Sequence, residues 1–264
     1  MRSVLVVAAT ALLLLPALPV LADHGLLPNL QTVVPRHLDL QNSHQREILR
    51  FSNGIANTGA GDWRLRPEFP LADPSEPQRA IQEILAADGS VAHEEVVSAF
   101  EYHPTHNHWH IAGVDTFALH HAADDGTGGA LGPVLVNDLG AAQSVKTTFC
   151  LIDWVRLEGN APTKERTYFD CFGDHQGISP GWIDQYHHAT DGQALDVTDA
   201  PPGVYYLVSE ANAAEVFLET DTGDNLAWTS LRLSRDSNGN AKIKVLGHSA
   251  CASDGLCGEQ SANR

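Results

Sequence analysis

The sequence contains little cysteine, methionine and positive charge. Its 264 residues include four cysteines and one methionine, and 16 Lys and Arg stand against 33 Asp and Glu, for a formal charge of −17. This scarcity of basic residues argues against a nucleic acid or an anionic membrane as partner, because both bind basic surfaces. It favours a cationic substrate instead. The hydrophobic share of 43% is ordinary for a globular protein and excludes general disorder.

Long apolar runs are confined to the start of the chain. Arg2 is followed by an apolar stretch from Val4 to Leu15 and by Val20-Leu21-Ala22, which suits cleavage. This pattern is typical of a secretory signal peptide over residues 1–22. The alternative is a retained membrane anchor, for which the apolar stretch is short. We expect residues 23–264 to form one domain with no membrane span, secreted or exported to the periplasm.

The four cysteines fit an oxidising compartment. Cys251 and Cys257 lie close together near the end of the sequence, and Cys150 and Cys171 frame a 20-residue interval. Of the three possible connectivities, the pairs Cys150–Cys171 and Cys251–Cys257 are the simplest. A zinc site built from thiolates is disfavoured because no Cys-x-x-Cys spacing occurs.

The sequence has no long amphipathic helix and no internal repeat, and its apolar or alternating runs predict strands instead. The expected strands cover residues 31–40, 46–55, 91–102, 108–119, 204–208 and 226–233. Asn238-Gly239 predicts a hairpin between residues 231–233 and 243–245. Two long loops are expected at 67–77 and 121–133. Together these elements predict a mostly β, single-domain sandwich with long loops and little helix.

Histidine is concentrated in one segment, where six of the 14 histidines fall between His103 and His121. Alternate residues share one face of a strand, so His106, His108 and His110 can converge on one ion. A straight strand would separate the outer two by about 13 Å, so the chain must bend here. Neutral imidazoles suit copper and zinc equally, and three of them leave positions open for water or substrate. The alternative is a strand face that is merely rich in histidine.

With this segment the sequence resembles the lysyl oxidase family, the secreted copper amine oxidases that oxidise lysine side chains. The three histidines occupy the positions of the family's copper ligands. Asp115-Thr116-Phe117 and His120 continue the pattern, and His103 matches a family histidine that is not one of the three ligands.

The resemblance continues downstream and covers roughly residues 90–230. Lys146-Thr147-Thr148-Phe149-Cys150-Leu151 looks like the segment that supplies the cofactor lysine. The segment that supplies the cofactor tyrosine resembles residues 176–181 followed by Asp184-Gln185-Tyr186. Residues 196–199 and 202–205 match the strand that follows.

The resemblance implies a lysine tyrosylquinone cofactor and an amine oxidase activity. Copper and O₂ would convert Tyr186 to a quinone, and the amine of Lys146 would add to it. Primary amines, peptidyl lysine among them, would be deaminated to aldehydes with release of hydrogen peroxide and ammonia. Asp184 is our candidate general base. The alternatives are an exposed lysine, a core tyrosine, and a surface acid or loop cap at Asp184.

A second metal site is suggested by an acidic segment near the end of the chain. Residues 219–225 contain three acids and an amide, which are the oxygen ligands that calcium prefers. Some family members bind calcium through a matching loop and an Asp-Leu pair, which is Asn29-Leu30 here. The resemblance therefore implies a calcium site at Asn29, Leu30, Glu219, Asp221, Asp224 and Asn225. The alternative is a solvated acidic turn.

Two departures from the family pattern bear on the expectations. Thr105 stands where animal members have a cysteine, and His175 is displaced relative to a family histidine. The chain looks like a stand-alone, bacterial-type catalytic domain. Its function is expected to be that of an oxidoreductase. Two alternatives are a non-enzymatic extracellular metal-binding β-sandwich module and a zinc hydrolase that uses the three histidines.

Overall fold

The computed structural model describes residues 25–43, 45–138, 140–143, 148–157, 162, 164–251 and 256–257. Within these residues the chain forms 19 strands and no helix, which confirms the prediction of a mostly β fold. The strands are β1 (Leu30–Thr32), β2 (Arg36–Ser43), β3 (Arg46–Asn57), β4 (Trp63–Pro67), β5 (Gln78–Leu85), β6 (Val91–His103), β7 (His108–Ala112), β8 (Asp115–Ala122), β9 (Leu131–Val134), β10 (Val136–Asn137), β11 (Gly140–Ala141), β12 (Thr148–Phe149), β13 (Val155–Arg156), β14 (Gln176–Ile178), β15 (Trp182–Tyr186), β16 (Ala194–Asp196), β17 (Gly203–Ala211), β18 (Leu226–Arg235) and β19 (Ala241–His248).

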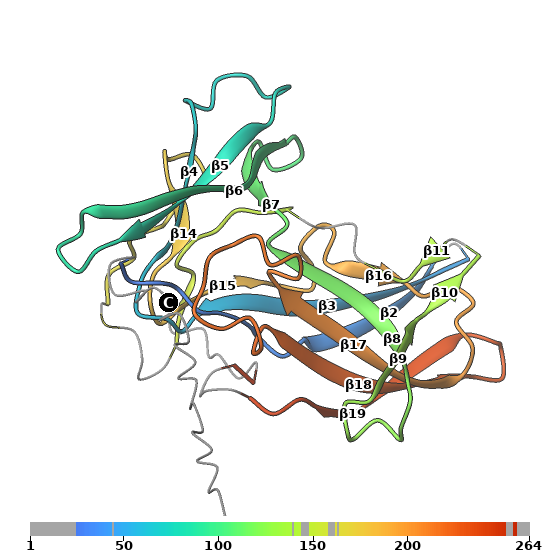
Figure 1. Cartoon of the computed structure of the whole chain (residues 1–264). Coiled ribbons are helices and arrows are strands. Elements are labelled where there is room, and N and C mark those ends of the chain that lie inside the picture. The colour runs from blue at the N-terminus through green and yellow to red at the C-terminus, as the bar shows by residue number, and fades with distance from the viewer. Residues whose placement is uncertain are drawn as a thin grey trace, which may run out of the picture.

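The strands form three antiparallel sheets and one two-stranded pair, β10–β11 (Figure 1). Sheet I has the order β12-β7-β6-β5-β4-β14, and sheet III has the order β19-β18-β17-β8-β9. In sheet II the order is β1-β3-β15-β13, and β2 and β16 also pair with β3. Strand β3 is 12 residues long, which lets it pair with four partners along its two edges. It therefore connects the two ends of the sandwich.

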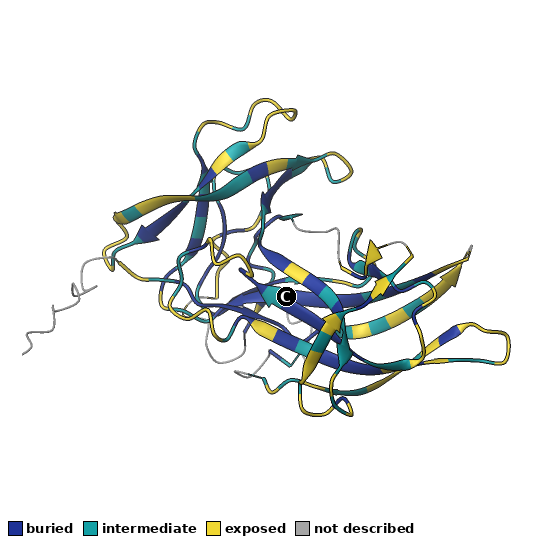
Figure 2. Ribbon diagram, turned by 45° about the vertical axis from the view of Figure 1, so that its right-hand side comes forward, coloured by how far each residue is buried: buried dark blue, intermediate teal, exposed yellow. Residues whose placement is uncertain are grey.

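Sheets II and III pack face to face, and sheet I projects from one end of this sandwich (Figure 1). The rings of Phe51 and Phe117 meet edge to face between the two sheets with centroids 4.9 Å apart. One continuous cluster of buried residues draws on all three sheets. In Figure 2 the buried residues follow the facing strands, and the exposed ones lie mainly on turns and on the projecting sheet. The three sheets therefore share one hydrophobic core.

Most of the expected strands are present, but two of them are divided. The run at 31–40 becomes β1 and β2, because Pro35 between them has no N–H for a sheet ladder. The run at 108–119 becomes β7 and β8, because Gly113 takes a φ of +71° and turns the chain. The expectation of one strand over each run was wrong.

The predicted hairpin and the two predicted loops are present. The hairpin is confirmed, with Leu231 opposite Val245 and Leu233 opposite Ile243. Both long loops are present, at residues 68–77 and 123–130. The expected signal peptide, residues 1–22, lies outside the described residues. Within the described part of the chain, no helix is long and apolar enough to cross a membrane.

Candidate metal centre and active site

The histidine segment is a hairpin rather than one strand. Strands β6 and β7 pair with His103 opposite His108, and residues 104–107 form the turn between them. The amides of His106 and Asn107 donate to the His103 carbonyl at 3.1 and 2.9 Å. Asn107 adopts a left-handed φ of 56°, which asparagine tolerates better than most residues. The turn supplies the bend that the sequence requires, and His106 lies in this turn.

The hairpin brings the rings of His106, His108 and His110 together. The Nε2 atoms of His108 and His110 are 3.0 Å apart, and His106 Nδ1 lies 3.5 Å from His110 Nε2. Nitrogens bound to one ion at about 2.0–2.1 Å lie about 3 Å from one another. These spacings therefore fit a shared transition-metal ion. Thr148 Oγ1 lies 3.1 Å from the second ring nitrogen of His110, a contact that fixes the orientation of this ring.

His103, which the sequence reasoning set aside as a ligand, lies against the same cluster. Its ring stacks on those of His106 and His110 with centroids 4.3 and 4.6 Å apart. One ring nitrogen from each of these three histidines falls in a group that spans less than 4.8 Å. Thr105 Oγ1 lies 3.0 Å from His103 Nδ1 and holds this ring. His103 is thus part of the wall around the candidate metal position.

A cavity of about 410 Å³ joins the histidines to the candidate catalytic residues. It is lined by His106, His108, His110, Cys150, Ile152, Trp154, Cys171, Asp184, Gln185, Tyr186 and Thr190. Asp184 and Tyr186 both come from β15, and their i, i+2 spacing places them on the same face of that strand. The structure therefore brings the three histidines, the candidate quinone precursor and the candidate base to one cavity.

Tyr186 is held in this cavity by polar and aromatic contacts. Its hydroxyl donates a hydrogen bond to the Cys150 carbonyl at 2.7 Å, and its ring meets Phe149 edge to face at 5.1 Å. Burial raises the pKa of the phenol well above its ordinary value, and the neighbouring carboxylate of Asp184 raises this pKa further. The phenol is therefore protonated at neutral pH, and its hydroxyl can donate a hydrogen bond to the Cys150 carbonyl or to the Asp184 carboxylate.

Asp184 is only 2% exposed. It pairs with Ile55 of β3, in the middle of sheet II, and its carboxylate interacts with the Tyr186 hydroxyl. The alternative interpretation of Asp184 as a surface acid or loop cap is therefore wrong.

Disulfides join the cysteines in the expected pairs, Cys150–Cys171 and Cys251–Cys257. The first disulfide forms part of the cavity wall, and its two sulfur atoms and a ring nitrogen of His108 lie within 4.8 Å of one another. Lys146 lies outside the described residues. The described chain resumes at Thr148, in strand β12, which pairs with the histidine strand β7.

Gln176 is a positioning residue whose role the sequence did not indicate. Its side chain is fully buried, and its amide donates to the Trp109 carbonyl at 2.7 Å. Its side-chain oxygen accepts from the Leu151 amide at 3.1 Å. Gln176 therefore ties the histidine strand to the segment that carries Cys150. The only available signal was the resemblance of Gln176-Gly177 to a family motif.

His175, next to Gln176, lies in a different place. It lines a separate cavity of about 250 Å³ with Arg64 and Tyr168. Its Nε2 atom is 2.9 Å from an Arg64 nitrogen and 3.2 Å from a Glu83 oxygen. Burial lowers the pKa of this imidazole, and the positive charge of Arg64 lowers it further. The structure therefore does not bring His175 to the histidine cluster.

The acidic segment forms a partly buried cluster with the start of β1. Glu219 accepts hydrogen bonds from the Leu30 amide at 2.8 Å, from Asn225 at 2.8 Å and from Asn212 at 2.6 Å. Burial raises the pKa of the Glu219 carboxyl. The Asn29 side-chain amide donates to Asp224 at 3.0 Å, and Gln31 donates to the same oxygen.

Two oxygens of this cluster suit a cation. Asp224 Oδ1 and Asn225 Oδ1 are buried, and neither has a hydrogen-bond partner among the residues that the structure describes. Buried oxygens without donors are expected where an ion supplies the missing contact. Asp221 is different, because its carboxylate is exposed and accepts from the Gly223 amide at 2.8 Å. The structure thus brings five of the six expected residues together and leaves Asp221 outside.

Comparisons with known proteins agree with the geometry. A family model described as "Lysyl oxidase" matches residues 86–242. Protein-lysine 6-oxidase of Sus scrofa is 26% identical over 194 residues, which are 74% of this chain and 60% of the relative. Lysyl oxidase homolog 1 of Homo sapiens is 32% identical over 127 residues, 48% of this chain and 19% of the relative. Lysyl oxidase homolog 2 of Mus musculus is 28% identical over 192 residues, 72% of this chain and 19% of the relative. The chain therefore spans less than two thirds of the length of each of these relatives.

Proposed function

Since the chain belongs to the lysyl oxidase family, we propose that it is a copper-dependent amine oxidase. It converts primary amines, peptidyl lysine among them, to aldehydes and releases hydrogen peroxide and ammonia. The observation that carries this proposal is the single cavity lined by His106, His108, His110, Asp184 and Tyr186. Neither a metal ligand set alone nor a buried tyrosine alone would support it.

Copper is proposed to bind through His106, His108 and His110. Imidazole nitrogens are suitable ligands for copper, and His110 lies at metal-ligand spacing from both His106 and His108. When bound, copper would let O₂ oxidise the Tyr186 ring to a quinone, and this quinone, joined to Lys146, would accept two electrons from the amine. The remaining contributions come from side chains around the cavity.

Asp184 is proposed as the general base. Its carboxylate is buried and lies beside the Tyr186 hydroxyl, so it is within reach of a substrate held at this ring. It would accept the proton from the substrate carbon that bears the nitrogen. Before that step, the ionised carboxylate would attract the substrate ammonium into the cavity.

The other walls of the cavity suit the carbon chain of an amine. Ile152, Trp154 and the Cys150–Cys171 disulfide offer apolar surface between the histidines and β15. Apolar walls with few polar groups are typical of sites that bind small molecules, and they reduce the water that reaches the reacting carbon. A lysine side chain has a suitable form, with four methylene groups and one terminal amine.

The test uses the full chain, produced with export and loaded with copper in air. We expect peroxide and ammonia on addition of butylamine or of a lysine peptide, together with positive quinone staining. Peptide mass analysis should find a covalent link between the peptides that contain Lys146 and Tyr186. Fully copper-loaded protein that consumes no O₂ and contains no such link would overturn the proposal.

Two other functions remain as outcomes of the same experiment. A non-enzymatic extracellular metal-binding module would bind copper but give neither peroxide nor a crosslink. A zinc hydrolase would require hydrolysis that depends on zinc and survives Tyr186→Phe. The pairing of Tyr186 with the histidines in one cavity favours the oxidase over both.

Calcium is proposed to bind at Glu219, Asp224 and Asn225, beside Asn29 and Leu30. The two buried oxygens without donors support this assignment. Calcium should therefore raise the melting temperature, because a ligand that binds only the folded state stabilises it. Asp224→Asn should abolish this shift, whereas Asp221→Asn should reduce it much less, since Asp221 lies outside the cluster. A melting temperature that does not change when calcium is added would contradict the assignment.

Export is proposed as well, with residues 1–22 as a cleaved signal peptide and residues 23–264 as the catalytic domain. Both disulfides, which need an oxidising compartment, support this proposal. N-terminal sequencing of the exported protein tests it, with Asp23 as the expected first residue.

A further inference from the structure

Two large aromatic side chains beside the candidate active site are exposed to solvent. Phe169 is 65% exposed and Phe172 is 71% exposed, although only two residues separate them in the sequence. Adjacent exposed apolar groups that are fixed in place are typical of interaction sites. We call residues 169–173, with these two rings, the aromatic ridge.

The ridge is anchored on both sides of Phe172. Cys171 is joined to Cys150 by a disulfide, and the amides of Phe172 and Gly173 both donate to Asp170 Oδ1 at 2.8 Å. The Phe172 ring meets His108 edge to face with centroids 5.8 Å apart. The Phe172 ring is therefore held next to His108, one of the candidate metal ligands.

The ridge separates the two cavities described above. Cys171 lines the cavity of the histidines and Tyr186, whereas Phe169, Asp170 and Gly173 line the cavity of Arg64 and His175. An amine in the first cavity leaves the second one empty. An extended chain that crosses the ridge can place one side chain in each cavity, because residues two positions apart point the same way. This arrangement fits a polypeptide better than a small amine.

The charge and chemistry of the surroundings define the occupant. The protein has a formal charge of −17, Asp184 lies in the first cavity, and Asp174 is exposed at the end of the ridge. In the second cavity the charge of Arg64 is compensated by Glu83, which it contacts at 2.6 Å, and Phe169 supplies an apolar wall. A basic segment with an apolar residue near its lysine therefore matches both the charge and the two cavities.

We infer that Phe169 and Phe172 are specificity residues that bind an apolar side chain flanking the target lysine of a cationic polypeptide substrate. This inference rests on the proposed amine oxidase function. It makes peptides with a leucine two positions from the lysine better substrates than peptides with a serine there. One apolar side chain in a pocket provides discrimination of about tenfold or more.

The test compares two short basic peptides that differ only in leucine or serine two positions from the single lysine. Their affinities are measured by calorimetry on copper-loaded Tyr186→Phe protein, which cannot form the quinone, and their kcat/KM values are measured on the wild type. We expect about a tenfold preference for the leucine peptide in both measurements. In the double variant Phe169→Ser, Phe172→Ser the preference should fall to less than about twofold.

Phe69 provides the matched control. It is 62% exposed on another loop and lines neither cavity, so Phe69→Ser should keep the tenfold preference. Equal affinity of the wild type for both peptides, or a preference that survives the double variant, would overturn the inference. A binding preference that depends on the ridge, without any oxidation of either peptide, would reject the oxidase function and leave the docking surface standing.

Discussion

The hydroxyl of Tyr186 donates to the backbone carbonyl of Cys150 at 2.7 Å. This hydrogen bond joins β15 to the segment around Cys150, which follows β12 in the sequence and precedes the aromatic ridge. The Cys150 segment is itself fixed, because Cys150 is bonded to Cys171 and the next amide, of Leu151, donates to Gln176. The phenol is therefore hydrogen-bonded to a segment that the Cys150–Cys171 disulfide and Gln176 hold in place.

Replacing Tyr186 by phenylalanine distinguishes a role of its hydroxyl in oxidation from a role in stability. Tyr186→Phe should abolish peroxide release and quinone staining, because the ring loses the oxygen that oxidation requires. The free energy of unfolding should fall by only about 1 kcal/mol, since one hydrogen bond is lost. Peroxide assays and urea unfolding provide the two measurements.

Tyr205 offers a matched control for this variant. Its hydroxyl donates to the Pro201 carbonyl at 2.7 Å, the same kind of contact, and Tyr205 does not line the cavity. Tyr205→Phe should cost a similar amount of stability and retain amine oxidation. Full activity in Tyr186→Phe, or equal loss in both variants, would count against a redox role for Tyr186.

Two buried glutamines should respond in opposite ways to replacement by methionine. Gln176→Met leaves the Trp109 carbonyl and the Leu151 amide without their partner, which should cost about 2 kcal/mol or more. It should also weaken copper binding about tenfold or more, because the histidine strand loses its tie to the Cys150 segment. Urea unfolding and copper competition with a chelator provide the measurements.

Gln193 is also fully buried, but neither polar atom of its side chain has a hydrogen-bond partner among the described residues. Gln193→Met should therefore be neutral or stabilising, because methionine has a similar length and requires no partner. If both variants lost stability equally, the bonds of Gln176 would not be the cause.

Local sequence patterns predicted the class of fold and the convergence of the histidines, because both depend on short spacings. The spacing of His106, His108 and His110 indicated convergence and a bend. The spacing alone did not show at which residue the chain bends, although asparagine, as at Asn107, is common in turns. Local patterns carry no information about contacts between distant segments. They therefore did not indicate that Tyr186 meets Cys150 or that Gln176 binds Trp109.

The acidic segment shows the same limit of predictions from local patterns. Composition made Asp221 and Asp224 equivalent candidates for calcium. The structure distinguishes them, because Asp221 closes a local turn through the Gly223 amide, whereas Asp224 reaches back to Asn29. Only the position of β1 beside this loop, a contact across more than 190 residues, decides which carboxylate joins the cluster.

Asp115 should make stability fall as the pH rises. Its side chain is fully buried beside Asn53 and Ser209, and burial raises its pKa to about 8. In the unfolded chain the carboxyl ionises near pH 4, so between about pH 4 and pH 8 the folded state binds the additional proton. The free energy of unfolding therefore loses up to about 1.4 kcal/mol per pH unit in this window.

Asp115→Asn removes this dependence while keeping the size of the side chain. Relative to the wild type, the variant should gain about 2–4 kcal/mol of stability between pH 5 and pH 8. Urea unfolding of both proteins at several pH values measures the difference. Parallel pH profiles for the two proteins would show that the carboxyl has the same pKa in both states.

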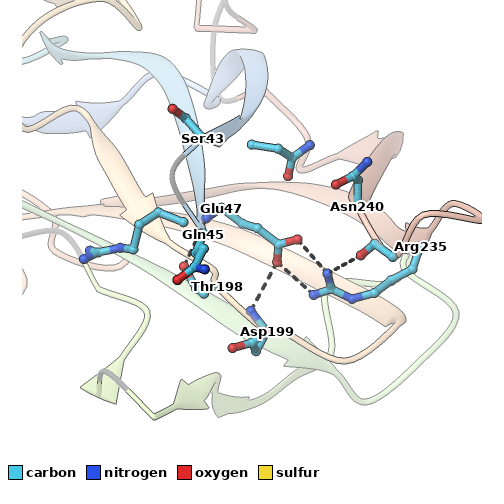
Figure 3. Close-up of a pocket in the computed structure, with 10 residues that line it drawn as sticks. Ser43, Gln45, Glu47, Thr198, Asp199, Arg235 and Asn240 are labelled. Carbon is cyan, nitrogen blue, oxygen red and sulfur yellow. Dashed lines mark hydrogen bonds and ion pairs between the residues drawn. The ribbon is translucent and has the colours of Figure 1, made fainter.

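Glu47, at the other end of the sandwich, should make stability fall as the pH falls. It lies in a polar cavity of about 540 Å³ near the β2–β3 and β18–β19 turns, where Arg235 donates to both of its carboxylate oxygens (Figure 3). Burial opposes ionisation of Glu47, but the hydrogen bonds from Arg235 and from two backbone amides outweigh it and lower the pKa. The contribution of Glu47 to stability is therefore present above about pH 4.5 and is lost as the pH falls through the lower, folded pKa.

Glu47→Gln should reduce the free energy of unfolding by about 2 kcal/mol at pH 7, because charged hydrogen bonds at a side chain with 12% exposure are lost. This difference from the wild type should shrink at pH 3, where the wild-type carboxyl is also becoming neutral. Glu68→Gln is the control, since its partner Arg79 is 62% exposed and such surface pairs contribute about 0–1 kcal/mol. A loss of stability at Glu47 that is the same at pH 3 and pH 7 would mean that packing, rather than the ion pair with Arg235, stabilises this end of the sandwich.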